Sequence, residues 1–317
     1  MQRAVASKEA ENRPPASMPI PQSQLETWSH QGAVATSSAA YNSIRQALLK
    51  ATSPLASRGV DIFLQGSYAN STNIYADSDV DVVVLYGSTF YKDLSALTPA
   101  QQQFHEALFP PAAYLWTHLR DDTLNALRSH YGNNSVTLGR KSIKVQTGCG
   151  RRPSDVVPAV QFRRYATFVD RNNLTAHWGI QLFDVSNNPI VNYPKYHIER
   201  GENKNQASRT GGQYKATVRI FKNLRNYLID THQLADRAAP SYFLECTLHN
   251  IPDHLFAGSF RDTVPAILSY LASNATGGFL CQNGVVPLFG NGPTQWSEAA
   301  LRAFVQAAKT VWDTWYT

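Results

Sequence analysis

Two aspartates, Asp79 and Asp81, stand one residue apart in SDVDVVVLY, a stretch that otherwise has the composition of a buried strand. Because side chains alternate between the faces of a strand, both carboxylates project from one face, and Val80, Val82 and Val84 project from the other. Neighbouring carboxylates repel one another unless a cation lies between them. Oxygen ligands at this spacing suit Mg²⁺, which commonly completes its shell with waters and substrate phosphates. The spacing predicts a metal site for a phosphate-bearing substrate.

A Gly-Ser turn precedes the aspartate pair. By itself, the D-x-D pattern also fits a strand end that meets solvent. Gly66 permits close approach of the backbone, and Ser67, at the expected start of a helix, offers a hydroxyl and backbone amides to phosphate oxygens. The combination favours nucleotide binding by Gly66 and Ser67, and Asp77 is interpreted as a turn residue.

A third carboxylate is required if two metal ions act in phosphoryl transfer. One ion activates the attacking hydroxyl and the other holds the leaving pyrophosphate, with the ions roughly 3.5 to 4 Å apart. Asp155, which opens the strand DVVPAV, is the candidate, although an aspartate after Pro153-Ser154 also suits a turn cap. We therefore predict Asp79, Asp81 and Asp155 as catalytic residues and as ligands of two Mg²⁺ ions, with Mn²⁺ as a substitute.

The carboxylates need a sheet that positions them. Alternation and apolar runs predict about five strands, a common sheet size. They are expected over residues 60–65, 79–86, 142–148, 154–165 and 178–185. Helical spacing predicts a helix within residues 36–55 and a helical segment over 98–130, which Pro110-Pro111 interrupts because proline lacks the amide donor.

The remainder of the chain is predicted to be helical. Apolar residues recur at helical spacing in segments 214–230, 241–251, 262–274 and 297–316, and the polar stretch 200–212 is the expected linker. The predicted fold class is α+β. We expect a disordered leader over residues 1–20, an α/β lobe with the carboxylates over 21–200, and a helical lobe over 201–317.

The composition excludes several classes of protein. The chain has 317 residues and a formal net charge of +6, which suits an anionic ligand but also fits a solvated basic surface. Cys149, Cys246 and Cys281 form no C-x-x-C pair and have no histidine at ligand spacing, which argues against structural zinc and a disulfide framework. With no secretory signal and no apolar run of membrane-spanning length, a cytoplasmic protein is expected.

The motifs GS, SDVD and the later Asp155 resemble the signature of the polymerase-β-like nucleotidyltransferase superfamily. LQGSYANSTNI, SDVDVVV and DVVPA are more closely similar to the bacterial relatives of cyclic GMP-AMP synthase, the CD-NTases of anti-phage (CBASS) signalling. The resemblance implies a bilobal nucleotidyltransferase core, with a mixed sheet and flanking helices, followed by a helical C-terminal lobe. It also implies a metal-dependent enzyme that condenses NTPs into a cyclic oligonucleotide second messenger and releases pyrophosphate.

The resemblance assigns roles in the helical part as well. It implies that Lys222 and Ser241 hold the donor triphosphate and that Tyr242 stacks on a base. From the residues alone, Lys222 belongs to a solvated basic arc, Ser241 is a helix N-cap and Tyr242 is a core aromatic. The other members of that basic arc are Lys215, Arg219 and Arg225.

Partners follow from the same resemblance. NTPs are the substrates, a separately encoded effector protein is activated by the product, and a regulatory partner protein is possible. No membrane partner is expected, and zinc-dependent DNA sensing is not implied, because nothing matches the zinc insertion of the mammalian enzyme. Arg151-Arg152 and Arg163-Arg164 are candidates to steer nucleotides, although such pairs are usually only solubilising.

Two alternatives stay open. The same chemistry could add nucleotides to RNA ends or to a protein or small molecule, although no separate RNA-binding module is visible. The chain could instead be a non-catalytic nucleotide sensor, against which the three carboxylates argue. The bases used, the linkage and the ring size are not predictable from the sequence.

Overall fold

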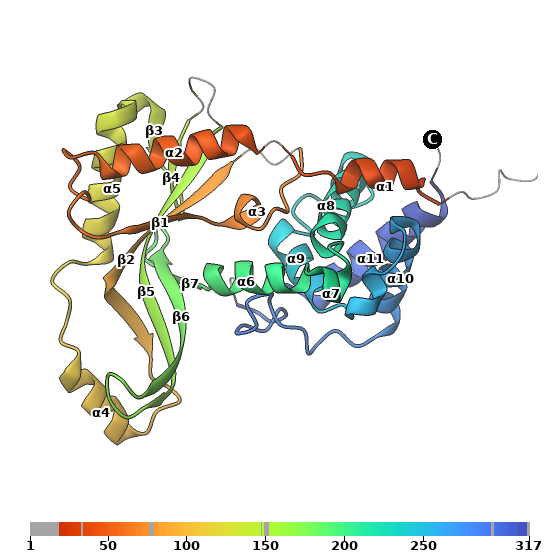
Figure 1. The fold of residues 1–317 in the computed structure, drawn as a ribbon. Coiled ribbons are helices and arrows are strands. Elements are labelled where there is room, and N and C mark those ends of the chain that lie inside the picture. The colour runs from red at the N-terminus through yellow and green to blue at the C-terminus, as the bar shows by residue number, and fades with distance from the viewer. Residues whose placement is uncertain are drawn as a thin grey trace, which may run out of the picture. The chain divides into compact units, whose positions relative to one another are not determined.

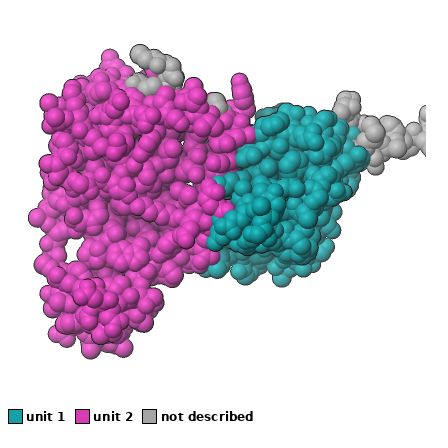
Figure 2. Space-filling view, in the orientation of Figure 1, with its two compact units in different colours: residues 1–30, 203–282, 286–317 teal, residues 31–202, 283–285 magenta. Residues whose placement is uncertain are grey.

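The computed structural model describes residues 19–32, 34–75, 79–146, 148, 152–292 and 295–315. The chain divides into two compact units, coloured separately in Figure 2. The first, which we call the sheet unit, comprises residues 31–202 and 283–285; the second, the helical unit, comprises residues 1–30, 203–282 and 286–317 as far as they are described.

The sheet unit is built on a seven-stranded mixed sheet, which confirms the α+β class (Figure 1). The strand order is β1-β2-β5-β4-β3, and β6 pairs with both β5 and β7. Strands β2 and β5 are parallel, and the other pairs are antiparallel. The strands are β1 (Asp61–Leu64), β2 (Val80–Asp93), β3 (Val136–Leu138), β4 (Ile143–Val145), β5 (Ser154–Phe168), β6 (Leu174–Phe183) and β7 (Pro189–Asn192).

Helices cover one face of this sheet. Helix α2 (Ala35–Leu49) packs on β2, and α5 (Trp116–Tyr131) packs on β5. Val80, Val82 and Val84 of β2 are fully buried in this core, as the alternation of the sequence predicts. The opposite face of the strand therefore presents Asp81. The remaining elements of the unit are α3 (Gly66–Ala69), α4 (Pro99–Leu108), η1 (Asn133–Ser135) and α6 (Pro194–Lys204).

A small aromatic core lies where α4 covers the far ends of β2 and β5, away from α2 (Figure 1). At its centre, His105 is fully buried, and its ring centroid lies 4.6 Å from that of Phe109, 4.7 Å from Tyr165 and 4.8 Å from Phe168. Neither ring nitrogen has a hydrogen-bond partner among the described residues. Burial lowers the pKa of His105, and the positive charge of Lys92 adds to the effect. The folded protein therefore holds this imidazole neutral.

We expect the protein to lose stability between about pH 7 and about pH 5 because of His105. In the unfolded chain the imidazole gains a proton near its ordinary pKa of 6.5, whereas the folded imidazole stays neutral until the pH reaches its lower pKa. The unfolded state then binds more protons, so the free energy of unfolding falls as the pH is lowered. Urea unfolding at both pH values measures the change. His105→Phe keeps an aromatic ring without the titration and should show a smaller loss; an equal loss in both proteins contradicts the prediction.

The helical unit contains six α-helices among the residues that the structure describes. They surround one hydrophobic core that includes Phe221, Phe256 and Phe304. The elements are α1 (Gln22–Ser29), α7 (Ala207–Thr210), α8 (Tyr214–Asp230), α9 (Ser241–His249), η2 (Asp253–Phe256), α10 (Phe260–Ser273) and α11 (Glu298–Asp313). No helix in the described ranges has both the length and the apolar content needed to cross a bilayer.

The N-terminal segment belongs to this second core. Residues 21–30, which the sequence places in the α/β lobe, pack in the helical unit, where Ile20 and Leu25 are fully buried. Most of the predicted leader, residues 1–18, lies outside the described residues. Local spacing cannot reveal which core a short amphipathic helix joins, because that depends on long-range packing.

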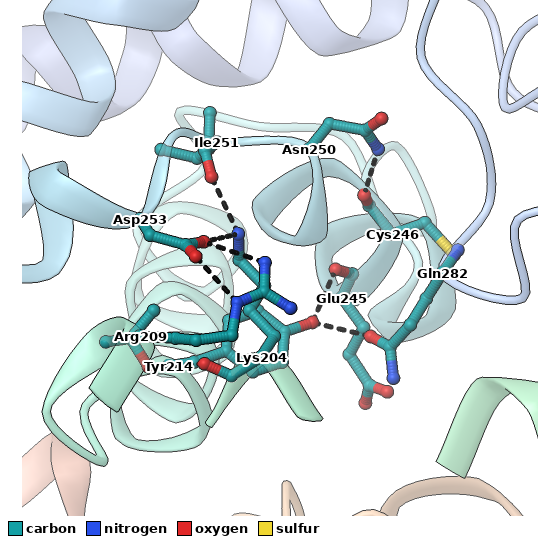
Figure 3. A network of polar contacts seen from close by, with 10 residues as sticks. Lys204, Arg209, Tyr214, Glu245, Cys246, Asn250, Ile251, Asp253 and Gln282 are labelled. Atoms are coloured by element: carbon teal, nitrogen blue, oxygen red, sulfur yellow. Dashed lines mark hydrogen bonds and ion pairs between the residues drawn. The ribbon is translucent and has the colours of Figure 1, made fainter. Parts of the chain in front are cut away.

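Residues 200–212, predicted as an irregular linker, contain the boundary between the two units at residues 202 and 203, but the segment is largely helical. Helix α6 continues to Lys204, and α7 spans Ala207–Thr210. An ion network around the buried Lys204 holds this polar segment in place. The Lys204 ammonium donates to Ile251 O at 2.7 Å and to Asp253 Oδ1 at 2.8 Å, and Arg209 Nε lies 2.7 Å from Asp253 Oδ2 (Figure 3). Polar composition was misleading because these charges pair with one another and Lys204 is buried by that pairing.

Candidate active site

The sheet unit brings the three predicted carboxylates to neighbouring backbone positions. Asp79 immediately precedes β2, Asp81 is its second residue, and Asp155 is the second residue of β5. Because β2 and β5 are parallel and pair in the register Asp81↔Asp155, these two side chains lie side by side on one face. Asp79 is exposed, and Asp81 and Asp155 are half-buried. A substrate can therefore reach all three.

Electrostatic repulsion is already visible at Asp155. Burial raises the pKa of its carboxyl group, and the negative charge of Asp79 raises it further, while Lys144 and a hydrogen bond from Ser142 oppose the shift. No group of three or more acidic, histidine or cysteine side chains among the described residues is arranged around one point as a ready metal site. Paired carboxylates completed by substrate phosphates are the usual form of a Mg²⁺ site, and the donor set fits that form.

Gly66 is required by the geometry of this site. Its φ of +68° is a conformation that favours glycine, and a Cβ there would overlap the Asp81 carboxylate oxygen Oδ2. The preceding residue, Gln65, donates its backbone amide to Asp81 O at 3.0 Å, which ties the turn to β2. Ser67 follows as the second residue of the four-residue helix α3. The Gly-Ser turn therefore lies directly against the carboxylate strand; Asp77 lies outside the described residues.

The helical unit holds the other predicted residues, Lys222 on α8 and Ser241 and Tyr242 on α9. Lys222 is fully buried, and its ammonium lies 2.8 Å from Glu245 Oε1. Lys215 of the same arc is also buried. The interpretation of this arc as a solvated basic face is therefore wrong: the charges of α8 turn inward, toward polar partners.

Ser241 and Tyr242 open α9. Pro240, not Ser241, is the N-cap residue, and the Ser241 hydroxyl instead accepts a hydrogen bond from Arg225 Nη2 at 3.3 Å. Arg225 also donates to Ala239 O at 2.7 Å, which joins α8 to the start of α9. Tyr242 keeps 38% of its surface exposed, so it is not a core aromatic. Burial of its hydroxyl end, together with the neighbouring Cys246 and Cys281, raises its pKa above the ordinary value.

The arginine pairs are occupied by structural contacts. The Arg163 guanidinium stacks 3.8 Å from the centroid of Phe90, and Arg164 Nε lies 3.0 Å from Asp93 Oδ2. Arg152 Nε donates to Thr36 Oγ1 at 3.1 Å, whereas Arg151 and Cys149 lie outside the described residues. The structure therefore favours structural roles for the described arginines over nucleotide steering.

Several polar neighbours of the site escape prediction from the sequence. Glu245 is a single acidic residue in the apolar helix SYFLECTLH, and such an isolated charge indicates a buried ion pair without naming its partner. Ser142 and Lys144 approach Asp155 through a hairpin whose register the sequence does not reveal.

A mixed sheet with carboxylates on adjacent parallel strands and a Gly-Ser turn against them defines a nucleotidyltransferase core. A family model described as the cGAS/DncV-like nucleotidyltransferase C-terminal helical domain matches residues 199–313. The chain is 42% identical over 300 residues to the cyclic UMP-AMP synthase of Rhodothermus marinus, covering 94% of this chain and 99% of that protein. It is 34% identical to the cyclic nucleotide synthase CdnE01 of Staphylococcus haemolyticus, and the match covers 94% of this chain and 100% of that protein.

The solved structures agree. The structure of Rhodothermus marinus CdnE c-UMP-AMP synthase with Apcpp and Upnpp superposes with a TM-score of 0.85 over 94% of this chain and 98% of that one, at 42% identity. The chain belongs to the bacterial cGAS/DncV-like nucleotidyltransferases, the CD-NTases. It is an enzyme that condenses NTPs into cyclic oligonucleotides, and its family is metal-dependent.

Proposed function

We propose that this enzyme joins one UTP and one ATP into a cyclic dinucleotide. The choice of bases is supported by the 42% identity to the cyclic UMP-AMP synthase over 94% of the chain. The relatives named as cyclic dipurine and cyclic dipyrimidine nucleotide synthases are less similar, with sequence identities of 32% and 30%. The observation that carries the chemistry is the direct register of Asp81 with Asp155 beside Asp79.

In the proposed reaction, a hydroxyl oxygen of the acceptor nucleotide bonds to the α-phosphorus of the donor. The bond between that phosphorus and the pyrophosphate oxygen breaks, and the hydroxyl proton passes to Asp155. Asp79, Asp81 and Asp155 would hold two Mg²⁺ ions, which supply charge neutralisation at the phosphates and lower the pKa of the attacking hydroxyl. The chain itself contributes mainly position: the Gly66 turn and Ser67 orient the donor phosphates against β2. A second transfer closes the ring.

The helical unit supplies the other contacts in this proposal. Lys222 and Ser241 bind the triphosphate, and the exposed ring of Tyr242 stacks on a base. Arg225 orients the Ser241 hydroxyl, and Glu245 holds the Lys222 ammonium in place before substrate binds. The cyclic product acts on a separately encoded effector protein in anti-phage signalling.

The test is a product analysis with all four labelled NTPs and either Mg²⁺ or Mn²⁺. We expect a phosphatase-resistant product that needs only UTP and ATP, has the mass of a cyclic dinucleotide, and is absent from the Asp79→Asn protein. A cyclic product with other bases contradicts the UMP-AMP assignment but retains the chemistry. Linear products, or label transferred to added RNA, support end addition; nucleotide binding without pyrophosphate release supports a sensor.

A further inference from the structure

The hairpin formed by β3 and β4 borders the carboxylates on the side away from β2. Strand β4 is antiparallel to β5, and Lys144 pairs directly with Asp155. Directly opposed residues of antiparallel strands point to the same face, with Cβ atoms about 4.5 to 5.5 Å apart. Since Asp81 pairs with Asp155 from the other side, the three adjacent strands carry a row of side chains in the order Asp81, Asp155, Lys144.

Ser142 makes a second contact from this hairpin. Its side chain hydrogen-bonds to the Asp155 carboxylate, to which a hydroxyl can only donate. The turn that presents Ser142 is closed by a hydrogen bond from Gly139 N to Ser142 O of 2.8 Å. Two side chains of one short hairpin, one through a hydrogen bond and one through its charge, thus act on the same carboxylate.

The path of the Lys144 side chain depends on Gly139. A Cβ at Gly139 would lie 3.2 Å from Lys144 Cε and 3.4 Å from Lys144 Cγ, closer than ordinary van der Waals contact. The bare glycine backbone therefore leaves room for the aliphatic stem, while Lys144 as a whole is exposed. The register places Lys144 beside Asp155, and its positive charge favours the ionised Asp155 carboxylate.

We propose that Ser142 and Lys144 are positioning residues for Asp155: the Ser142 hydroxyl orients the carboxylate, and the Lys144 charge offsets the repulsion among the site carboxylates before metal and substrate bind. This inference rests on the proposed function, in which Asp155 is a metal ligand. Residues that hydrogen-bond to a metal ligand fix its orientation, and their loss typically costs about 10- to 100-fold in metal affinity or activity.

Ser142→Ala tests the orientation. We expect kcat for pyrophosphate release to fall about 10-fold while KM for the NTPs changes little, because the lost hydrogen bond acts on a ligand carboxylate. Ser142→Thr keeps the hydroxyl and should recover most of the loss. Thermal unfolding of the three proteins reports whether the hairpin is intact. The orienting role is overturned if Ser142→Ala keeps the kcat of the parent. It is also overturned if Ser142→Thr is as stable as the parent but does not recover kcat.

Lys144→Met tests the charge. Removing a cation beside the site lessens its repulsion of metal, so the half-saturating Mg²⁺ concentration should fall about 3-fold even as kcat decreases. Lys144→Arg should behave like the parent. Lys141→Met removes an equal charge from the exposed turn of the same hairpin, at a position that does not pair with Asp155, and is the matched control. An unchanged or raised Mg²⁺ requirement in Lys144→Met, or the same fall in Lys141→Met, overturns the charge role.

Asp155→Asn separates this inference from the proposed function. If Asp155→Asn keeps parent activity, the proposed role of Asp155 fails, and the positioning role fails with it. If Asp155→Asn is inactive while Ser142→Ala and Lys144→Met behave like the parent, only the positioning role fails. A lower kcat in all three variants, together with a lower half-saturating Mg²⁺ concentration in Lys144→Met, supports both.

Discussion

Asp81→Asn should lower the rate of pyrophosphate release by about 10³-fold, the equivalent of losing several kcal/mol of charge stabilisation at the metal ions. The substitution keeps the shape of the side chain but removes the negative charge with which Asp81 would bind Mg²⁺. Asp79→Asn should have a similar effect. Initial rates with UTP, ATP and saturating Mg²⁺ measure both.

A loss of protein stability should not explain the lower rates of Asp79→Asn and Asp81→Asn. Asp81 and Asp155 oppose each other in register, with Asp79 next to them, so removing one charge relieves repulsion and should leave the thermal midpoint unchanged or raised. Asp121→Asn provides a matched control, since this aspartate is exposed and pairs with Arg120 at 2.9 Å on the surface of α5. If Asp79→Asn and Asp81→Asn retain parent activity with Mg²⁺, the assignment of the site is wrong.

Strong local signals account for the parts of the fold that the sequence predicts. Val80, Val82 and Val84 share one buried face of β2, as the alternation predicts, and Val83 is buried on the opposite face. The helical segment over 98–130 ends at Leu108 and resumes at Trp116, on either side of Pro110-Pro111. Asp79 and Asp81 could be named for the same reason, because their spacing is a local pattern at the start of β2. Asp155 could be named because it opens an apolar strand of its own, although its pairing with Asp81 depends on the sheet.

Long-range pairing explains what the sequence does not predict. The polar segment around Lys204 is helical because Asp253, far along the chain, pairs with it. His105 is buried without a hydrogen-bond partner among the described residues, which no local pattern indicates. The contact of Ser142 with Asp155 depends on the register of β4 with β5, and register is set by tertiary packing.

Lys222→Met should destabilise the helical unit by about 3 to 5 kcal/mol, because it leaves Glu245 buried without its partner ammonium. Glu245→Leu should lower the free energy of unfolding by a similar amount, since it leaves the charge of Lys222 buried without the Glu245 carboxylate. The double variant should recover much of the loss, because an apolar pair of similar volume often replaces a buried ion pair at little cost. Guanidinium unfolding followed by circular dichroism measures all three. Arg302→Met, which breaks the exposed Arg302–Glu298 pair, should cost well under about 1 kcal/mol.

The double variant also separates the two roles of Lys222. If the ammonium serves only to pair with Glu245, a stable double variant should keep the parent KM for both NTPs. If it also binds the donor triphosphate, the fold recovers but KM rises at least about 10-fold, since a charged hydrogen bond is lost on binding. Recovery of stability without recovery of affinity would show that Glu245 holds a substrate-binding lysine in a buried position. If the double variant does not recover stability, the prediction that Lys222 and Glu245 stabilise the unit only through each other is contradicted. Other polar groups that contact the two side chains would then also contribute.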